Sequence, residues 1–377
     1  MKKIIVFCTS IAVLLVIFIC FLTFTIDKKP VINESISVEA FKDGIHHWNL
    51  EHEFRDYPRF KAYQELEIAD NFIAWQNADG GWPKNIDWLG VLNVDSVRST
   101  LKEHYKTSTL DNRNTYAQID YLARVYVKYG EKKYKKAALR GIEFLISQQY
   151  FNGGWRGWDT DAITFNDEVM TGVMNLFLDI VQDKDQYRWV KRSLRRKVHK
   201  SWDKGLELIL KCQIEQNGIK TAWAQQHDHN TYEPVMGRSF ELPGITANES
   251  CSIVNLLMRI EEPSDEVISA VNSAVKWLEK SKITGIRVDM VPIKKEDIIN
   301  HEYPYDNVVV ADSTARPIWS RFYECDTNKP FMSTRGGEKV YTLAEVDPER
   351  RTGYSWYGYW PEEVFKNYAL WKKTLMN

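Results

Sequence analysis

The 377-residue chain lacks the features that mark several protein classes. It has only 5 cysteines, no two of which have CxxC spacing, so neither a disulfide framework nor a zinc ribbon is indicated. A formal net charge of -1 excludes a generally basic nucleic-acid-binding protein, and no nucleic-acid partner is expected. With 12 Pro, 19 Gly and 44% hydrophobic residues, the chain is neither collagen-like nor disordered. The composition therefore predicts a globular protein.

The chain has one long uncharged run, at residues 4–25, and it follows Lys2 and Lys3. A length near the ~20 residues that span a bilayer, behind a basic start, is typical of an export signal or a membrane anchor. No small-x-small cleavage site follows, because the exit reads FTIDKKP. We therefore predict that residues 1–26 are a signal or anchor segment. The remainder is expected to be exported, and to be extracellular, periplasmic or held at the cell surface.

The rest of the chain divides at about residue 57. Residues 27–56 are polar and aperiodic and predict a linker, whereas 57–377 form a single predicted domain with few alternating strand patterns. Short strands are expected near GIRVDMV and EKVYTL, in the C-terminal third. Apolar periodicity predicts helices at 59–76, 115–129, 133–149, 167–182, 191–214, 249–261, 265–281 and 361–375.

A helix, a Gln, a turn and a Trp recur about 70 residues apart. The copies are QNADGGW at 76–82, QQYFNGGW at 148–155 and the weaker CQIEQNGIKTAW at 212–223. Helix pairs that recur at such a period stack on one another and curl around a central cleft. The sequence therefore predicts an all-α fold, an incomplete α/α toroid of about three helical repeats with short β elements toward the C-terminus. Terpenoid cyclases share this repeat, but their acidic DxDD motif is absent here.

Two acidic clusters follow the first two repeats. STLDNRNTY at 108–116 and TFNDEV at 164–169 each open a predicted helix, so helix capping explains part of each cluster. Capping does not explain adjacent acidic groups, which are the ligands that a hard cation such as calcium prefers.

Two further clusters lie in the C-terminal half. In WAQQHDHNTYEPVMGRSFELP at 223–243, the two histidines are two residues apart, which does not suit a helical zinc site, and a hydrogen-bonded loop histidine is the preferred interpretation. RPIWSRFYECDTNKPFMSTRGG at 316–337 interleaves arginines with aromatic residues. Such an array suits a polysaccharide that carries carboxylates, because Arg binds carboxylates bidentately and aromatic rings stack on sugar faces.

Together, several ordered blocks resemble polysaccharide lyase family ten, the calcium-dependent pectate lyases. These blocks are NADGGWPKN, STLDN, TYAQIDYLARVY, QQYFNGGW, AITFNDEVM, WAQQHD, GRSFELP and RFYECDTNKPFMSTRGGEKVYTLAEVDPERRTGYSWYG, within residues 57–371. The resemblance implies an α/α toroid with a substrate groove. It also implies calcium as cofactor and cleavage of α-1,4-linked polygalacturonate by β-elimination, which gives 4,5-unsaturated oligogalacturonides.

The resemblance also implies roles for individual residues. Asp111 and Asp167 match aspartates of the calcium and catalytic centre, Asn112 is a further candidate calcium ligand, and Arg238 matches the catalytic arginine, the proposed base. An arginine base is unusual, because a guanidinium has a pKa above ~12. Arg321, Arg335 and Lys84 are the candidates for binding substrate carboxylates.

Two other functions stay open at this stage. A glycoside hydrolase on the same toroid would need two carboxyl groups about 5 to 9 Å apart, for which Asp167 with Glu241 or Asp228 are candidates. A surface protein that binds pectin without cutting it would need only the aromatic and arginine groove. In each case the expected partner is polygalacturonate, and the protein is expected to be a monomer.

Overall fold

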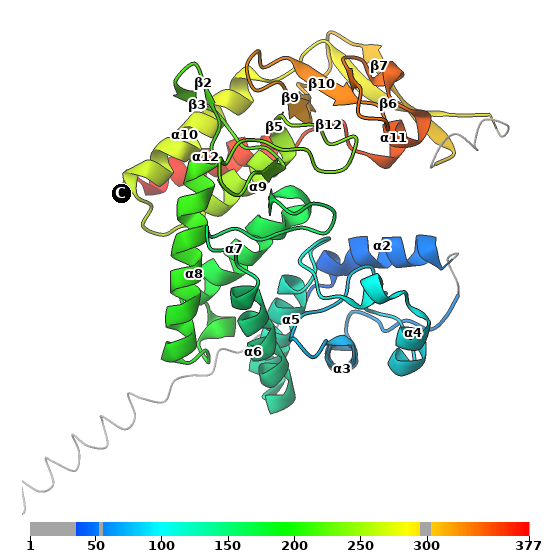
Figure 1. Ribbon diagram of the computed structural model, residues 1–377, viewed down its shortest axis with the longest axis vertical. Helices are drawn as coiled ribbons and strands as arrows, with labels where there is room; N and C mark the ends of the chain where they lie inside the picture. Colours follow the sequence, from blue (N-terminus) through cyan, green and yellow to red (C-terminus); the bar gives the residue numbers. More distant parts are fainter. Residues whose placement is uncertain (1–34, 53–55, 295–302, 377) are drawn as a thin grey trace, which may run out of the picture.

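A computed structural model describes residues 35–52, 56–294 and 303–376 (Figure 1). The segment 1–26, with its predicted signal or anchor, lies outside these residues. Within the described ranges, none of the helices has the length and hydropathy that a membrane span requires. The helices are α2 (Lys42–Glu51), α3 (Glu65–Trp75), α4 (Val94–Thr100), α5 (Tyr116–Tyr129), α6 (Lys132–Ser147), α7 (Val169–Val181), α8 (Arg192–Lys211), α9 (Ala247–Met258), α10 (Asp265–Lys280), α11 (Pro348–Gly353) and α12 (Pro361–Thr374).

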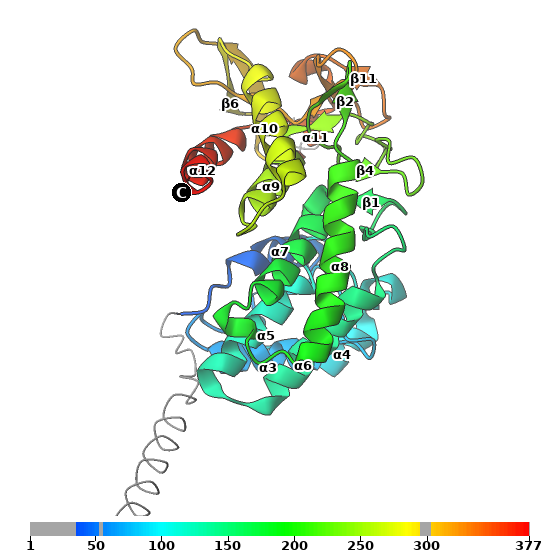
Figure 2. The same cartoon turned by 90° about the vertical axis from the view of Figure 1, so that its left-hand side faces the viewer.

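The long helices form two layers (Figures 1 and 2). α3, α6, α8 and α10 pack side by side in one layer, and α5, α7, α9 and α12 pack in the other. Consecutive helices pair across the layers, as α5 with α6 and α7 with α8, and their short connections make each pair antiparallel. The predicted all-α fold, an incomplete α/α toroid, is confirmed.

The repeated tryptophans tie each turn to the helix before it. Each is buried, and its indole Nε1–H donates to a backbone carbonyl near the end of that helix, where helix geometry leaves carbonyls without partners. The four bonds run from Trp82 to Phe72 (2.7 Å), from Trp155 to Leu145 (2.8 Å), from Trp223 to Ile209 (2.7 Å) and from Trp319 to Leu278 (2.7 Å). The fourth bond extends the three predicted repeats by a partial copy after α10.

The repeated glutamines connect neighbouring repeats. The Nε2 group of each donates both to a carbonyl of its own turn and to a carbonyl of the next helix in the same layer. The second acceptors are Ala137 for Gln76, Ser201 for Gln149 and Ala270 for Gln213, at 2.8 to 2.9 Å. The Gln of the motif therefore stabilises the stacking of α3 on α6, α6 on α8 and α8 on α10.

The glycine pair allows these helices to approach closely. Gly80 and Gly153 have φ of +100° and +102°, and a Cβ on either would lie 2.4 to 2.5 Å from a backbone carbonyl oxygen of the next helix. In the third copy, Gly218 also has a positive φ of +75°, but no atom lies within 4 Å of its Cβ position. The third motif is weaker in sequence because its turn makes no such close approach.

Short β elements lie toward the C-terminus, as predicted, and cover one end of the helical layers (Figure 1). GIRVDMV forms part of β6 (Ile286–Pro292), which pairs with β7 (Tyr305–Ala311) in an antiparallel hairpin. EKVYTL contributes only β11 (Lys339–Val340), an edge strand of the small sheet ordered β11-β10-β9-β5. The other members of that sheet are β10 (Pro330–Ser333), β9 (Phe322–Tyr323) and β5 (Ile245–Thr246).

The structure corrects the predicted linker at 27–56 over its described residues. Phe41 and Trp48 are buried, and the Phe41 ring packs 4.8 Å from that of Phe72 on α3. Phe41, Ile45 and Trp48 share the helical spacing i, i+4, i+7, an apolar stripe that the polar residues between them conceal. Helices α4 and α11 were also not predicted, and the predicted helix 59–76 begins only at Glu65.

Candidate active site

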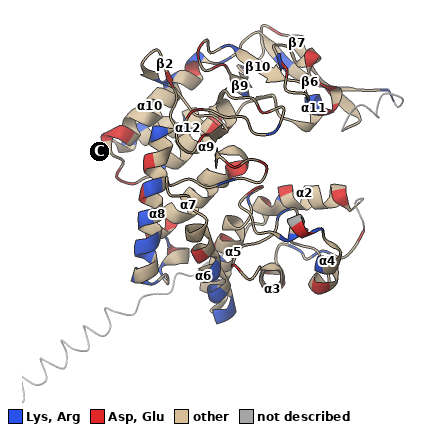
Figure 3. Ribbon diagram, viewed as in Figure 1, with Lys and Arg blue, Asp and Glu red and all other residues tan. Residues whose placement is uncertain are grey.

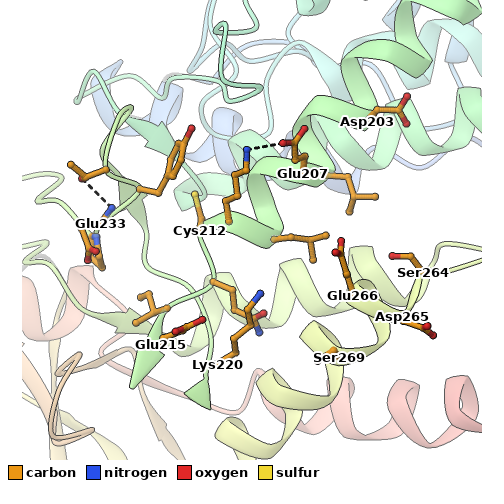
Figure 4. Close-up of a pocket in the computed structure, with 18 residues that line it drawn as sticks. Asp203, Glu207, Cys212, Glu215, Lys220, Glu233, Ser264, Asp265, Glu266 and Ser269 are labelled. Atoms are coloured by element: carbon orange, nitrogen blue, oxygen red, sulfur yellow. Dashed lines mark hydrogen bonds and ion pairs between the residues drawn. The ribbon is translucent and has the colours of Figure 1, made fainter. Parts of the chain in front are cut away.

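Two cavities among the described residues differ in charge. The larger, about 1110 Å³, lies between α8, the β2–β3 hairpin (Glu215–Gln216 and Ile219–Lys220) and the start of α10 (Figure 4). None of the predicted site residues lines it. Its charged side chains are Asp203, Glu207, Glu215, Glu233, Asp265 and Glu266 against Lys211 and Lys220. This excess of carboxylates repels a polyanion, so the larger cavity is not the candidate site.

The second cavity, about 560 Å³, brings together most of the predicted site residues. They come from the loops before α5 and α7, from the turn after α3, and from the C-terminal half. They are Lys84, Asp111, Asn112, Asp167, Arg238 and Arg321. Arg335 does not line this cavity. Its guanidinium lies over the buried Phe240 ring at 5.4 Å and is largely exposed, with Nε 3.7 Å from Glu349 Oε1.

The repeat itself positions the acidic loops. The backbone carbonyl of each repeated Trp accepts an N–H from a threonine that leads into the next helix. The bonds join Thr109 to Trp82 (3.0 Å), Thr164 to Trp155 (3.0 Å) and Thr246 to Trp223 (2.8 Å). Two residues after each threonine come Asp111, Asn166 and Asn248. Thus the turn that stabilises the fold also places a polar side chain at the start of α5, α7 and α9.

Both acidic loops carry unusual backbone conformations. Asn112 and Arg113 have φ of 52° and 58°, and Asp167 and Glu168 have φ of 50° and 57°. Non-glycine residues in this region cost free energy and concentrate at functional sites. An ion pair between Arg113 and Glu168, Nη2 to Oε1 at 2.7 Å, joins the two loops at the surface.

Lys84 and Asp111 form a buried ion pair at one wall of the cavity. Lys84 Nζ lies 2.6 Å from Asp111 Oδ2, and the two side chains are 10% and 7% exposed. The same ammonium lies 4.5 Å from the centroid of the Trp158 ring. Asp111 therefore presents a carboxylate with one oxygen already bound to a cation.

Asp167 is the most perturbed carboxyl group of the cavity. Burial, and then the negative charge of Asp111, raise the pKa of Asp167 from 3.8 to about 7, although Arg238 and Arg321 act in the opposite direction. Its Oδ2 accepts a hydrogen bond from Asn166 Nδ2 at 3.0 Å. A buried carboxyl group whose ionisation is disfavoured by a second carboxylate of the same cavity is poised to bind a cation.

Arg238 is held by Glu241. The guanidinium Nη2 lies 2.5 Å from Glu241 Oε1, and the Arg238 backbone N–H donates to Oε2 at 2.9 Å. Burial opposes the charged guanidinium, but the hydrogen bond and charge of Glu241 outweigh it and raise the pKa of Arg238 above its ordinary value. In this state Arg238 is a cation.

Arg321 sits in a buried polar network behind the cavity. Its Nη2 donates to Glu249 Oε1 at 2.5 Å and to Asn166 Oδ1 at 3.1 Å, and its guanidinium lies 4.5 Å from the Tyr354 ring centroid. Tyr354 in turn donates to Glu241 at 3.1 Å. Both Arg238 Nε and Arg321 Nε are buried without a hydrogen-bond partner among the described residues. A bound anion would satisfy such orphaned donors.

The donor set fits a hard divalent cation in part. Asp111 and Asp167 supply carboxylate oxygens, and Asn112, whose side-chain amide donates to Asn85 Oδ1 at 3.0 Å, supplies an amide oxygen. Within the described ranges, no three His, Cys, Asp or Glu side chains converge into a complete metal site. Calcium also takes amide and water oxygens, so two carboxylates and one amide suit it as a site shared with water or a ligand.

Several lining residues were not predicted from the sequence. Asp43 and His47 reach the cavity from α2, and Arg350 and Tyr354 reach it from α11 and the residue after it. The apolar stripe of α2 was the available signal for the first pair. Arg350 and Tyr354 lie within the quoted ERRTGYSWYG, but nothing in that string specifies a role.

The carboxyl pairs considered for hydrolysis are not supported. Asp228 is half-buried and accepts the backbone N–H groups of Asn230 and Thr231 in its own loop, and it does not line the cavity. Glu241 is 1% exposed and bound to Arg238. His227 is buried and hydrogen-bonded through both ring nitrogens, as predicted.

Comparisons with known proteins identify the family of the chain. The profile of the pectic acid lyase family matches residues 76–365. Two similar solved structures are of a family 10 polysaccharide lyase from Cellvibrio cellulosa, one of them an aspartate-to-alanine mutant in complex with trigalacturonic acid. Each has 25% identity and a TM-score of 0.66, and covers 88% of this chain and 98% or 96% of its own. No curated protein matches the chain. The chain belongs to the pectic acid lyase family and is a polysaccharide lyase.

Proposed function

We propose that the protein is a pectate lyase that cleaves α-1,4-linked polygalacturonate by calcium-assisted β-elimination and releases 4,5-unsaturated oligogalacturonides. The observation that carries the proposal is the pair Asp111 and Asp167, which line one cavity with the buried cations Lys84 and Arg321 and the half-buried Arg238. The bound trigalacturonic acid of the similar structure supports the choice of substrate.

The charge of the cavity favours a cation cofactor. Asp43, Asp111, Asp159 and Asp167 oppose Lys84, Arg238, Arg321 and Arg350 among the lining residues. Four carboxylates and four cations leave no net attraction for a polymer that carries one carboxylate per sugar. Asp111, Asp167 and Asn112 would hold calcium, which when bound adds positive charge, neutralises a substrate carboxylate and acidifies the proton next to it.

Substrate carboxylates would find donors among the cations that line the cavity, chiefly Arg321. Arg321 is held in one orientation by Glu249 and by stacking on Tyr354, so little side-chain entropy is lost when it binds a carboxylate. The unpartnered Nε of Arg321 gives it a donor to offer. Lys84 is a positioning cation for Asp111, and Arg335 stays a weaker candidate, outside the cavity.

Arg238 is the proposed base that takes the proton from carbon five of the galacturonate. In the state described, Glu241 keeps the guanidinium protonated. The role therefore requires that substrate binding separate Arg238 from Glu241, in a site that already holds other cations, so that the neutral guanidine becomes accessible. The electrons of the broken carbon–hydrogen bond form the double bond between carbons four and five, and the glycosidic oxygen leaves carbon four with its bonding pair and takes a proton from water.

The test is the ultraviolet absorbance of polygalacturonate incubated with the full chain, in calcium and separately in a chelator. We expect a rise that needs calcium and is lost in Asp167→Asn. Asp185→Asn, which removes an exposed carboxylate remote from the cavity, is the matched control and should keep the activity. New reducing ends without a rise would indicate hydrolysis, and retained binding without new ends would indicate a non-catalytic pectin-binding protein.

A further inference from the structure

A basic face covers the N-terminal ends of α6 and α8. Figure 3 shows Lys and Arg gathered along the lower half of α8 and at the lower end of α6. We define this face by seven exposed residues for which no ion pair is found in the described part of the chain: Lys132, Lys136, Lys191, Arg192, Arg196, Lys197 and Lys200. The net charge of the whole chain is -1, so this concentration is local.

Nearby acidic groups are already paired. Asp70 and Glu131 bind Lys133 at 2.5 and 3.4 Å, Asp183 binds Arg195 at 2.7 Å, and Asp185 binds Arg188 at 2.9 Å. Lys135 lies 5.3 Å from the Trp189 ring centroid, a contact that joins the start of α6 to the segment before α8. The seven residues therefore give the adjoining starts of α6 and α8 more positive charges than negative ones.

Helix stability does not explain these cations. The N-terminal end of a helix carries a partial positive charge, so lysine and arginine are unfavourable there. Neither α6 nor α8 has an acidic residue in its first turn, whereas α10 has Asp265 and Glu266 and α12 has Glu362 and Glu363. The lysines and arginines of the basic face thus lie where the helix dipole disfavours them. Their presence there points to a partner that is negatively charged.

The chain enters the described structure at this same end. The backbone N–H of Ile36 donates to Glu65 Oε1 at 2.9 Å, and Glu65 also binds Lys128 and Tyr129 at the end of α5. Only Gly130 and Glu131 separate Tyr129 from α6. The preceding 34 residues, which contain the uncharged run 4–25, therefore join the domain beside the basic face.

The candidate active site lies at the opposite end of the helices. Asp111 and Asp167 precede the N-terminal ends of α5 and α7, and the partners of these helices, α6 and α8, run antiparallel to them. α8 has 20 residues, a length of ~30 Å. A flat surface in contact with the start of α8 would leave the cavity facing away from it.

We propose that the basic face docks on an anionic membrane surface. Lipid headgroups are the favoured polyanion because the uncharged N-terminal run joins the domain at this end, and a hydrophobic segment with an adjacent basic patch gives two membrane attachments at once. The cavity would then face outward toward its polymer. This inference does not depend on the chemistry of the lyase reaction.

The experiment uses the full chain in vesicles, with a fluorophore on Ser193→Cys, an exposed position in the first turn of α8, and an acceptor on lipid headgroups. We expect energy transfer to be higher in vesicles that contain phosphatidylglycerol than in phosphatidylcholine alone, and to fall with salt. Each cation near the surface contributes about fivefold in affinity. Neutralising Lys191, Arg192, Arg196 and Lys197 to Gln should therefore remove the lipid-dependent transfer.

The matched control neutralises four exposed lysines on α10 and α12, namely Lys276, Lys280, Lys366 and Lys373, and should keep the transfer. The α8 variant should melt no lower than the native chain, because the removed charges oppose the helix dipole. Equal transfer in both kinds of vesicle, or full transfer in the α8 variant, would overturn the inference. So would a loss of polygalacturonate binding in the α8 variant without any dependence on lipid, which would assign the face to the substrate polymer.

Discussion

Replacing Asp167 by Asn should stabilise the protein when calcium is absent. Burial and the charge of Asp111 raise the pKa of Asp167 from 3.8 to about 7. Between these values the folded state retains a proton that the unfolded state has lost, so the free energy of unfolding falls as pH rises through this window. A tenfold change in ionisation corresponds to about 1.4 kcal/mol, so at pH 8 the cost reaches an upper limit of about 4 kcal/mol.

Asn removes this cost and keeps an oxygen that can accept from Asn166 Nδ2. In a chelator at pH 8, the free energy of unfolding of Asp167→Asn should therefore be about 2 to 4 kcal/mol higher than that of the native chain. At pH 4, just above the unfolded pKa of 3.8, the unfolded state of the native chain has lost little proton-binding free energy, so the two proteins should differ by less than about 1 kcal/mol. Denaturant unfolding at the two pH values measures the difference.

Added calcium should reverse the order of stability of the two proteins. A ligand that binds only the folded state stabilises it by mass action, so the native chain should gain stability with added calcium and Asp167→Asn should gain almost none. Asp185→Asn, an exposed carboxylate in an ion pair with Arg188, is the control and should follow the native chain in both conditions. If Asp167→Asn were less stable than the native chain in chelator at pH 8, or gained as much from calcium, the assignment of Asp167 to a strained cation site would be wrong.

Three further changes test the site and the repeat. Arg238→Lys should lower kcat by about 100-fold or more at moderate pH with KM little changed, because loss of a general base typically lowers the rate by that factor. Retention of most activity would refute the base role. Arg321→Lys should raise KM about tenfold in steady-state assays, because Lys cannot reproduce the fork held by Glu249, and an unchanged KM would refute its contact with substrate. Gly153→Ala should lower the free energy of unfolding, measured in denaturant, by more than about 2 kcal/mol, because its Cβ would lie 2.4 Å from a carbonyl oxygen. Gly218→Ala, in open space, should lower it by about 1 kcal/mol. Equal losses in the two variants would refute the close-approach argument.

The sequence was informative where the signal is local. The helix, Gln, Gly and Trp motif lies within about ten residues, and its side chains bond to carbonyls of the preceding and neighbouring helices. The acidic loops follow the first two copies of the repeat, so both clusters stood out in the sequence, and the family resemblance then singled out Asp111 and Asp167 within them. The third loop, Thr246 to Glu249, repeats the pattern of Thr164 to Asp167 and was available to the same reasoning, but was missed.

Long-range pairings were not predictable in this way. Arg321 binds Glu249 across 72 positions, and Gln225 donates to Tyr354 across 129. Neither pairing produces a periodic pattern in the sequence, because each depends on how the C-terminal β elements fold over the helices. The exclusion of Arg335 from the cavity has the same origin: its backbone N–H donates to Asp347 at 2.5 Å, which directs the residue to the surface around Phe240.

The repeat explains why the site is asymmetric even though its scaffold is not. Each repeated Trp uses its indole N–H to hold one helix and its carbonyl to hold the loop into the next, so three equivalent polar positions surround the cleft. Asp111 occupies the first of these positions and Asp167 lies one residue after the second, and we propose that this pair holds a cation. In the third loop, Glu249 lies one residue after Asn248 and binds Arg321, the residue that we propose contacts a substrate carboxylate. In the proposed function, divergence of these loop residues between repeats would separate cation binding from substrate binding, while the shared tryptophan and threonine bonds keep the scaffold the same.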